Sequence, residues 1–154
     1  NFYNSYSPGE KRDIIGLQNY EFDITFLPLI CYEIIYSGKL SKNNNYDLII
    51  NISEDGWFGK SIGPYQHFSH SIFRSIEEGK SIIRSTNNGT SALINPNGQV
   101  SKISESTYEG VIEINQIKNP KKTFFSKYGN NIFFYFIAIY ISLIFFLKTN
   151  REIK

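Results

Sequence analysis

The last part of the chain contains an uninterrupted apolar run, Ile132 to Leu147, with no charged residue, no glycine and no proline. As an α-helix this run would span about 24 Å, and adding residues 128–131 extends it to about 20 residues, the usual length for crossing a hydrocarbon core. Apolar side chains cover every side of such a helix, so it does not fit at a water surface. We therefore expect a transmembrane helix over residues 131–148, with a buried core helix of a large domain as the alternative.

Basic residues lie on both sides of the apolar run. A linker over residues 121–130 contains three lysines, and a short basic tail over residues 149–154 follows Lys148. Because both flanks are positive, the positive-inside rule does not decide which way the helix is oriented. The mean hydropathy of the whole chain, −0.27, averages this apolar run with the more polar composition of residues 1–120.

The composition excludes several classes of protein. The chain has 154 residues, enough for one domain, and a net charge of +2, which does not fit a polybasic nucleic-acid arm. The single cysteine, Cys31, excludes an internal disulfide framework, and one cysteine with two histidines cannot form a zinc site from these residue types alone. Because the sequence starts at Asn1 and contains no methionine, we expect it to be a piece of a longer polypeptide.

Residues 1–120 carry short signals that are typical of an α/β structure. A helix is expected from Pro64 to Gly79, because proline suits the first turn and apolar residues then recur at three- and four-residue steps. Residues 53–63 form a glycine-rich loop with large apolar side chains, the kind of loop that covers a site. Strands are expected at residues 22–33, 46–52, 81–85, 91–95, 99–105 and 110–115.

The strongest candidate for chemistry is Cys31, which ends the first expected strand and directly precedes Tyr32 and Glu33. Taken alone, a cysteine at the end of an apolar strand is more often an inert packed thiol. Reactive groups, however, gather at the carboxyl ends of sheet strands, where loops can bring partners to them. A working thiol nucleophile also needs a base for its proton and a cation for the anion.

Other polar residues have simpler interpretations. His67 and His70 share a helix face without a third ligand nearby, so we expect surface or interface histidines rather than a metal site. Residues 54–55 and 77–78, all acidic, are expected to be solvated charges or helix-end partners. Arg84 falls within a short apolar strand, where a buried guanidinium would need an anionic partner.

Longer motifs cover most of the chain. They are PLICYEIIYSG at 28–38, NISEDGWFG at 51–59, GPYQHF at 63–68, RSIEEGKSIIRSTNNGTSALINPNGQV at 74–100 and TFFSKYGN at 123–130. Together they resemble the C-terminal part of a bacterial apolipoprotein N-acyltransferase, a membrane enzyme with a nitrilase-type (carbon–nitrogen hydrolase) domain. The resemblance implies an α/β fold, in which residues 1–120 are the C-terminal part of a four-layer α-β-β-α sandwich and one transmembrane helix follows.

The resemblance also implies a Glu-Lys-Cys triad with Cys31 as the nucleophile. It implies that Tyr32 and Glu33 support the thioester, and that Trp57 and Phe58 flank the acyl or lipoprotein site. In such enzymes an acyl chain passes from a phospholipid to the thiol as a thioester, and then to the α-amino group of diacylglyceryl-cysteine in an apolipoprotein. No metal and no cofactor are implied.

The implied partners are a phospholipid donor, a diacylated apolipoprotein acceptor and the membrane, and no nucleic acid. The implied location is the bacterial inner membrane, with the catalytic domain on the periplasmic side and residues 149–154 in the cytoplasm.

The family's Glu and Lys precede its Cys by a long stretch of chain, and no matching segment precedes Pro28 here. Glu10 and Lys11 are the nearest candidates, and neither is assigned a role. Because losing one member of a triad costs about 10³-fold or more, we expect the chain alone to be essentially inactive.

Two alternatives stay open at this point. The first is a nitrilase-type amidase, in which the same cysteine attacks an amide or nitrile and water resolves the intermediate; the apolar helix argues against it. The second is a non-catalytic, truncated membrane fragment.

Overall fold

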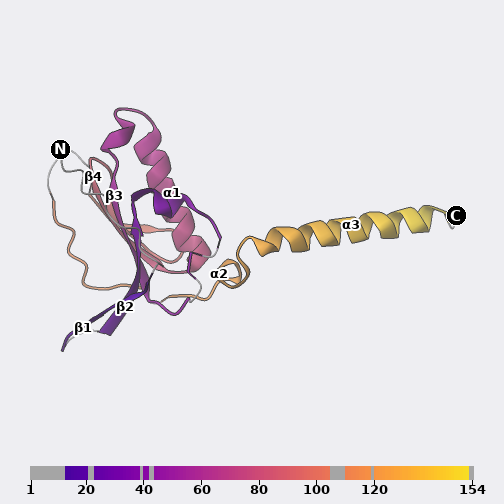
Figure 1. The fold of residues 1–154 in the computed structure, drawn as a ribbon, viewed down its shortest axis with the longest axis horizontal. Helices are drawn as coiled ribbons and strands as arrows, with labels where there is room; N and C mark the ends of the chain where they lie inside the picture. Colours follow the sequence, from indigo (N-terminus) through magenta and orange to yellow (C-terminus); the bar gives the residue numbers. More distant parts are fainter. Residues whose placement is uncertain are drawn as a thin grey trace, which may run out of the picture.

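A computed structural model describes residues 13–20, 23–38, 40–41, 44–104, 110–118 and 120–152, so Glu10 and Lys11 lie outside the described residues (Figure 1). The strands are β1 (Ile15–Gln18), β2 (Asp23–Ile30), β3 (Leu48–Glu54), β4 (Ser81–Asn87), β5 (Ser91–Ile94) and β6 (Val100–Ser104). Two short 3-10 helices, η1 (Cys31–Ile35) and η2 (Gly56–Phe58), follow β2 and β3. The α-helices are α1 (Gly63–Glu78), α2 (Phe124–Tyr128) and α3 (Asn131–Glu152).

The six strands form one mixed sheet whose spatial order equals the chain order. β2, β3 and β4 are parallel, and the remaining pairings are antiparallel. In the parallel part, Asn51 of β3 lies opposite Leu29 of β2 and Arg84 of β4. The carboxyl ends of the three parallel strands therefore meet at one edge, where their following residues can form a site.

Five of the six expected strands are confirmed, with bounds shifted by a few residues in the described range. β1 was not predicted, because its four residues are all exposed and no burial pattern marks them. The strand expected at 110–115 is wrong, since the backbone over residues 110–118 is irregular. A strand needs backbone hydrogen bonds to a neighbouring strand, whereas this segment is held by side chains. The Lys102 ammonium donates to the Glu113 carbonyl, and Ser81 Oγ donates to the Lys118 carbonyl at 3.3 Å.

Helix α1 covers one face of the sheet (Figure 1). The core under it is aliphatic and comes mainly from the parallel strands: Leu27, Leu29, Ile34, Ile49, Ile82, Ala92 and Ile94. The helix expected at 64–79 is confirmed to within one residue at either end. Its buried residues are polar, namely His67, Ser71, Arg74, Ser75 and Glu78, whereas Tyr65 and Ile76 of the expected apolar repeat are exposed. The reason lies in the sheet, where Asn51, Ser53 and Arg84 are also buried and pair with polar groups.

The opposite face of the sheet carries apolar side chains that are open in this structure. Ile30 and Ile52 are 69% and 62% exposed. The described residues therefore form two layers, one sheet and one covering helix. The four-layer sandwich stays a prediction.

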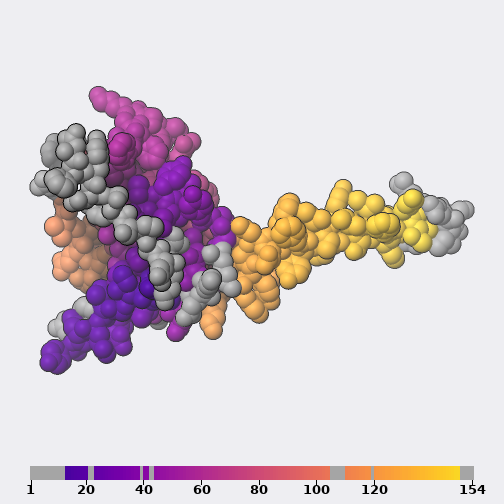
Figure 2. Space-filling model, viewed as in Figure 1, coloured from indigo at the N-terminus to yellow at the C-terminus, as the bar shows by residue number. Residues whose placement is uncertain are grey.

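Helix α3 leaves the sheet domain at α2 and extends away from it (Figures 1 and 2). By length and composition, residues Asn131–Thr149 could cross a membrane, and none of this apolar window is buried against the rest of the chain. Within the described residues α3 is thus no core helix. Membrane crossing itself stays a prediction.

Candidate active site

Strand β2 ends in a strained turn at Cys31. The φ of this residue is +50°, in the left-handed region that side-chain-bearing residues rarely adopt. The chain continues from it as η1, and the thiol is half-exposed, with Sγ 4.0 Å from the Glu54 carbonyl oxygen. Backbone strain of this kind persists only where surrounding contacts enforce it, and it is concentrated at functional sites.

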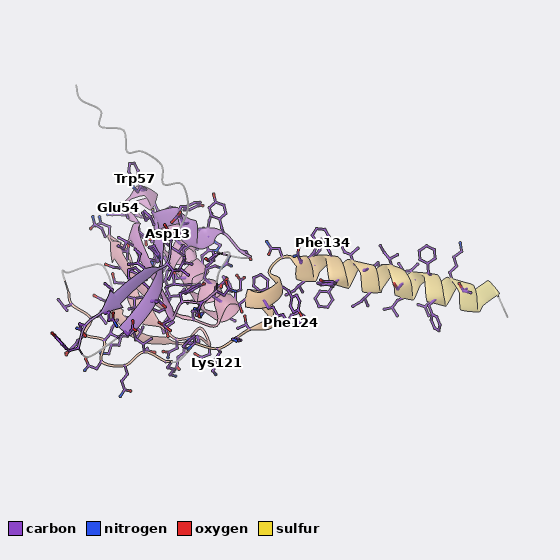
Figure 3. The ribbon with its side chains drawn as sticks, turned by 60° about the horizontal axis from the view of Figure 1, so that its bottom comes forward. Asp13, Glu54, Trp57, Lys121, Phe124 and Phe134 are labelled. Atoms are coloured by element: carbon purple, nitrogen blue, oxygen red, sulfur yellow. The ribbon has the colours of Figure 1, made fainter. Side chains whose placement is uncertain are left out.

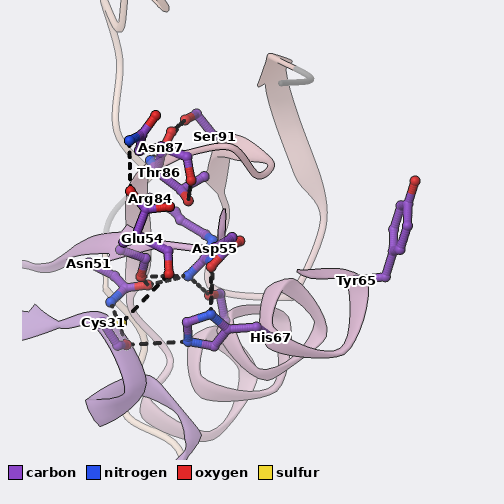
Figure 4. Close-up of polar contacts among 12 residues, drawn as sticks. Cys31, Asn51, Glu54, Asp55, Tyr65, His67, Arg84, Thr86, Asn87 and Ser91 are labelled. Atoms are coloured by element: carbon purple, nitrogen blue, oxygen red, sulfur yellow. Dashed lines mark hydrogen bonds and ion pairs between the residues drawn. The ribbon is translucent and has the colours of Figure 1, made fainter. Parts of the chain in front are cut away.

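Two side chains face the carbonyl oxygen of Cys31 (Figure 4). Nδ2 of Asn51 lies 3.4 Å from it, and Nε2 of His67 lies 3.3 Å from it. The same Asn51 amide donates to the carbonyl oxygen of Leu29 at 3.0 Å. One β3 side chain and one α1 side chain therefore bind the backbone on both sides of the strained turn.

Behind these two side chains lies a fully buried ion pair. One terminal nitrogen of Arg84 donates to both carboxylate oxygens of Asp55, at 2.9 and 2.8 Å, and neither side chain has measurable solvent exposure. The other terminal nitrogen donates to Oδ1 of Asn51 at 2.5 Å. Nδ1 of His67 lies 2.7 Å from Asp55. The two side chains that hold the turn are thus both anchored on the ion pair. We call Asn51, Asp55, His67 and Arg84 the turn network.

The loop after β3 places Asp55 inward and Glu54 outward. Glu54 accepts from the backbone nitrogen of Gly56 and from Nδ2 of Asn87, each at 2.6 Å, which ties the ends of β3 and β4 together. A Cβ at Gly89 would lie 2.2 Å from Oδ2 of Asp55, so the β4–β5 turn passes directly over this carboxylate. The expectation that residues 54–55 are solvated charges or helix-end partners is wrong for the side chain of Asp55, which is completely buried and makes no capping hydrogen bond to η2.

Comparison with known proteins places the chain in a family. The family model described as carbon-nitrogen hydrolase matches residues 4–117. The chain belongs to the carbon–nitrogen hydrolase family.

Curated relatives of this carbon–nitrogen hydrolase are named apolipoprotein N-acyltransferase. The protein of Wigglesworthia glossinidia brevipalpis is 38% identical over 142 residues, which is 90% of this chain and 28% of that protein. The protein of Rickettsia bellii is 42% identical over 133 residues, covering 79% of this chain and 26% of that protein. The resemblance drawn from the motifs is confirmed. The chain spans about a quarter of the length of these relatives.

Among solved structures, XC1258 from Xanthomonas campestris, described as a CN-hydrolase superfamily protein, has a TM-score of 0.49 at 16% identity, covering 68% of this chain and 43% of that one.

Of the three aromatic residues expected near the site, Tyr32 and Phe58 lie against the turn network and Trp57 does not. The rings of Tyr32 and Phe58 each lie 5.6 Å, centroid to centroid, from the ring of His67. Trp57 is 86% exposed and points away from the sheet domain (Figure 3). Phe58 therefore contacts the network, while Trp57 is free to contact a ligand.

Glu33 lies beneath the strained turn. Its Oε2 accepts a hydrogen bond from the backbone nitrogen of Ile30 at 2.7 Å. This contact spans the residue in the left-handed conformation, so Glu33 supports the backbone of the turn.

The structure brings together residues that the sequence analysis assigned elsewhere. His67 was expected at a surface or interface, yet it is 2% exposed and contacts Cys31 and Asp55. The anionic partner required for a buried Arg84 is confirmed as Asp55. One signal could have revealed a buried polar partner of Arg84, although not Asp55: Asn51 and Arg84 both interrupt apolar strands that are parallel neighbours, and they share a hydrogen bond.

No group of three or more His, Cys, Asp or Glu side chains suited to a metal ion occurs in the part of the chain that the structure describes. His70, one helical turn after His67, has a lowered pKa because of burial first and the nearby Arg74 cation second.

Proposed function

We propose that this chain carries the acyl-accepting cysteine of an apolipoprotein N-acyltransferase. The observation that carries the proposal is the strained turn at Cys31, held from behind by a buried network at the carboxyl edge of a parallel sheet. The names of the curated relatives supply the reaction class. Nucleophilic residues on a strained strand-to-helix turn project into solvent, where a substrate carbonyl can reach them.

The proposed reaction has two steps on one sulfur atom. The Cys31 thiolate attacks an ester carbonyl of a phospholipid, a C–S bond forms, and the C–O bond to glycerol breaks. The lysophospholipid alkoxide leaves and takes up a proton. The α-amino group of diacylglyceryl-cysteine then attacks the thioester carbonyl, an amide forms, and the C–S bond breaks to regenerate the thiolate while the amine loses a proton.

The base and the cation for this chemistry are proposed to come from a Glu and a Lys upstream of this chain, as the family resemblance implies. In the described part of the chain, the recorded hydrogen-bond contact of the Cys31 thiol is with the Glu54 carbonyl oxygen, and no lysine ammonium contacts it. We therefore propose that this chain alone is essentially inactive. Tyr32 and Glu33 are proposed to support the thioester, and Trp57 with Phe58 to flank the acyl or lipoprotein site.

The remaining organisation is also part of the proposal. Residues 1–120 form part of the catalytic domain, with a second sheet packing on the open apolar face around Ile30 and Ile52 to complete the four-layer sandwich. A basic linker at 121–130 leads into a transmembrane helix at 131–148 and a tail at 149–154. The catalytic domain faces the periplasm from the bacterial inner membrane.

Trapping of the thioester tests the central step. The polypeptide that includes the upstream Glu and Lys is incubated with phospholipid alone, and Cys31 is examined by mass spectrometry. We expect the mass of a fatty acyl group on Cys31 and none in Cys31→Ala. An adduct from a small amide, with none from phospholipid, would favour a nitrilase-type amidase and overturn the proposal.

Two further measurements test the remaining claims. Incubating the 154-residue chain with phospholipid and a diacylglyceryl peptide should give no turnover, and measurable turnover contradicts the proposed inactivity.

Because Cys31 is the single cysteine of the chain, a membrane-impermeant thiol reagent added to spheroplasts reports its side of the membrane. Labelling is expected, and protection until the membrane is permeabilised would place the domain in the cytoplasm.

A further inference from the structure

A cavity lies at the end of the parallel strands opposite to Cys31. It has a volume of about 470 Å³, and Tyr46, Glu78, Lys80, Lys122, Ser126 and Lys127 are among its lining residues. Tyr46 and Lys80 precede β3 and β4, whereas Cys31 follows β2. Because the seven residues of β3 rise about 3.3 Å each, the two ends lie about 20 Å apart. Figure 3 shows Lys121, which also lines the cavity, at one end of the domain and Trp57 at the other.

The walls of this cavity are fixed by hydrogen bonds between distant parts of the chain. The backbone nitrogen of Lys121 donates to the Gly79 carbonyl at 2.7 Å, and Thr123 Oγ1 donates to that of Glu77. A Cβ at Gly79 would meet the Lys121 carbonyl oxygen at 2.0 Å, so the linker lies directly on the end of α1. From the other side, Asn44 donates to the Ser126 carbonyl at 2.5 Å. The walls of the cavity are therefore held in place by specific contacts of the fold.

Positive charge dominates the lining. Four lysines, Lys80, Lys121, Lys122 and Lys127, face two carboxyl groups, Asp47 and Glu78.

The four ammonium groups outnumber the two carboxyl groups of the lining. Asp47 is held by the nitrogen and hydroxyl of Thr25, at 2.7 and 2.8 Å. Burial raises the pKa of Glu78, which favours its neutral form, and its Oε1 has no hydrogen-bond partner. Burial lowers the pKa of Lys80, while nearby Asp47 and Glu78 raise it, and its Nζ already donates to the carbonyls of Asn44, at 3.3 Å, and Tyr46. The cavity thus offers several donors and excess positive charge to an anion.

The cavity also lies beside the start of the apolar helix. Lys127 is four residues before Asn131, where the stretch able to cross a membrane begins. If that helix spans the membrane, as the proposed function requires, the cavity opens at the level of the lipid headgroups. Anionic headgroups are attracted by lysines in that position.

We propose that this cavity binds the phosphate group of an anionic phospholipid. The inference rests on the membrane location in the proposed function. A lipid bound there is not the acyl donor, since its ester carbonyls cannot reach a thiol about 20 Å away. It holds the domain against the membrane in one orientation while a different lipid reacts at Cys31.

Binding of short-chain lipids to the detergent-solubilised chain tests the proposal. The chain carries Cys31→Ala, so no acyl transfer is needed, and calorimetry compares dihexanoylphosphatidylglycerol, dihexanoylphosphatidylcholine and inorganic phosphate. The anionic lipid should bind most tightly. Lys122→Gln/Lys127→Gln should weaken its binding about 10-fold or more, whereas the control Lys60→Gln/Lys102→Gln, which removes two exposed charges outside the cavity, should not.

Each other outcome has a definite meaning. Equal binding by both double variants, or equal binding of the two lipids, overturns the proposal. Inorganic phosphate that binds as tightly as the anionic lipid shows that the ligand is a soluble phosphate and also overturns it. Because binding is measured without Cys31, failure to detect the thioester in the parent protein would reject the acyltransferase proposal alone.

Discussion

The two ends of the parallel strands differ in how completely their buried polar groups are paired. At the carboxyl end, Asp55 and Arg84 neutralise each other, and apart from Nε of Arg84 their polar atoms are paired. At the amino end, Oε1 of Glu78 and Oδ1 of Asn44 have no partner, and lysines gather around an open cavity. A network in which nearly every polar atom is paired fixes one backbone geometry, whereas unsatisfied groups beside open space suit a ligand.

The largest expected effect comes from breaking the saturated end. Arg84→Met leaves the carboxylate of Asp55 buried without its guanidinium partner and with His67 as its remaining contact in the turn network, which should destabilise the fold by about 3–5 kcal/mol. Urea unfolding in detergent, followed by circular dichroism, measures the loss. The double variant Asp55→Asn/Arg84→Met should recover part of it, because no lone buried charge remains. A double variant less stable than Arg84→Met would show that the two residues do not act as a pair.

His67→Phe tests whether His67 positions the Cys31 turn separately from its packing contribution to the fold. The substituted ring can keep the packing against Tyr32 and Phe58, but it cannot donate to the Cys31 carbonyl. We expect faster backbone hydrogen exchange over η1, and about 100-fold slower acylation in the polypeptide that includes the upstream Glu and Lys, since small misplacements of a reacting group cost this much.

The matched control is His70→Phe, one turn further along α1 and outside the contacts to Cys31. It should leave both readouts unchanged. Equal slowing of acylation by both substitutions would contradict a specific positioning role for His67.

Gly79→Ala tests how much the contact between the linker at Lys121 and the end of α1 contributes to stability. Gly79 has a φ of +64° and no room for a Cβ beside the Lys121 carbonyl, so alanine should cost about 1–3 kcal/mol. Thermal unfolding measures this cost. Gly16→Ala is the control, because nothing lies within 4 Å of a Cβ there. If both substitutions lower the melting temperature equally, the linker contact contributes nothing specific.

The sequence predicted the layout of the fold better than the contents of its site. Alternating and continuous apolar runs predicted five strands, because burial in a sheet imposes such patterns, and Pro64 with apolar residues at three- and four-residue steps predicted α1. The position of Cys31 at the end of a strand also followed from the sequence. The roles of Asp55 and His67 did not, because each is buried only through a partner from another element, Arg84 or the Cys31 turn. Pairing across elements leaves no periodic signal along the chain.

The smallest expected effect concerns the open end and depends on pH. Burial raises the pKa of Glu78, so between its unfolded and folded values the native state binds more protons than the unfolded state. Stability from this group is therefore present at low pH and lost as pH rises through the folded pKa.

Glu78→Gln removes the ionisation. It keeps an acceptor for the hydroxyl of Tyr46, which donates to Oε2 of Glu78 at 3.0 Å. Melting temperatures at pH 4 and pH 8 should show that the variant gains stability over the parent chain only at pH 8. Glu113→Gln, which removes an exposed carboxylate from the irregular segment, should not show this gain. A variant that is less stable than the parent at pH 8 would show that the ionised Glu78 stabilises the cavity, and would make its lysines partners of this carboxylate in place of an external anion.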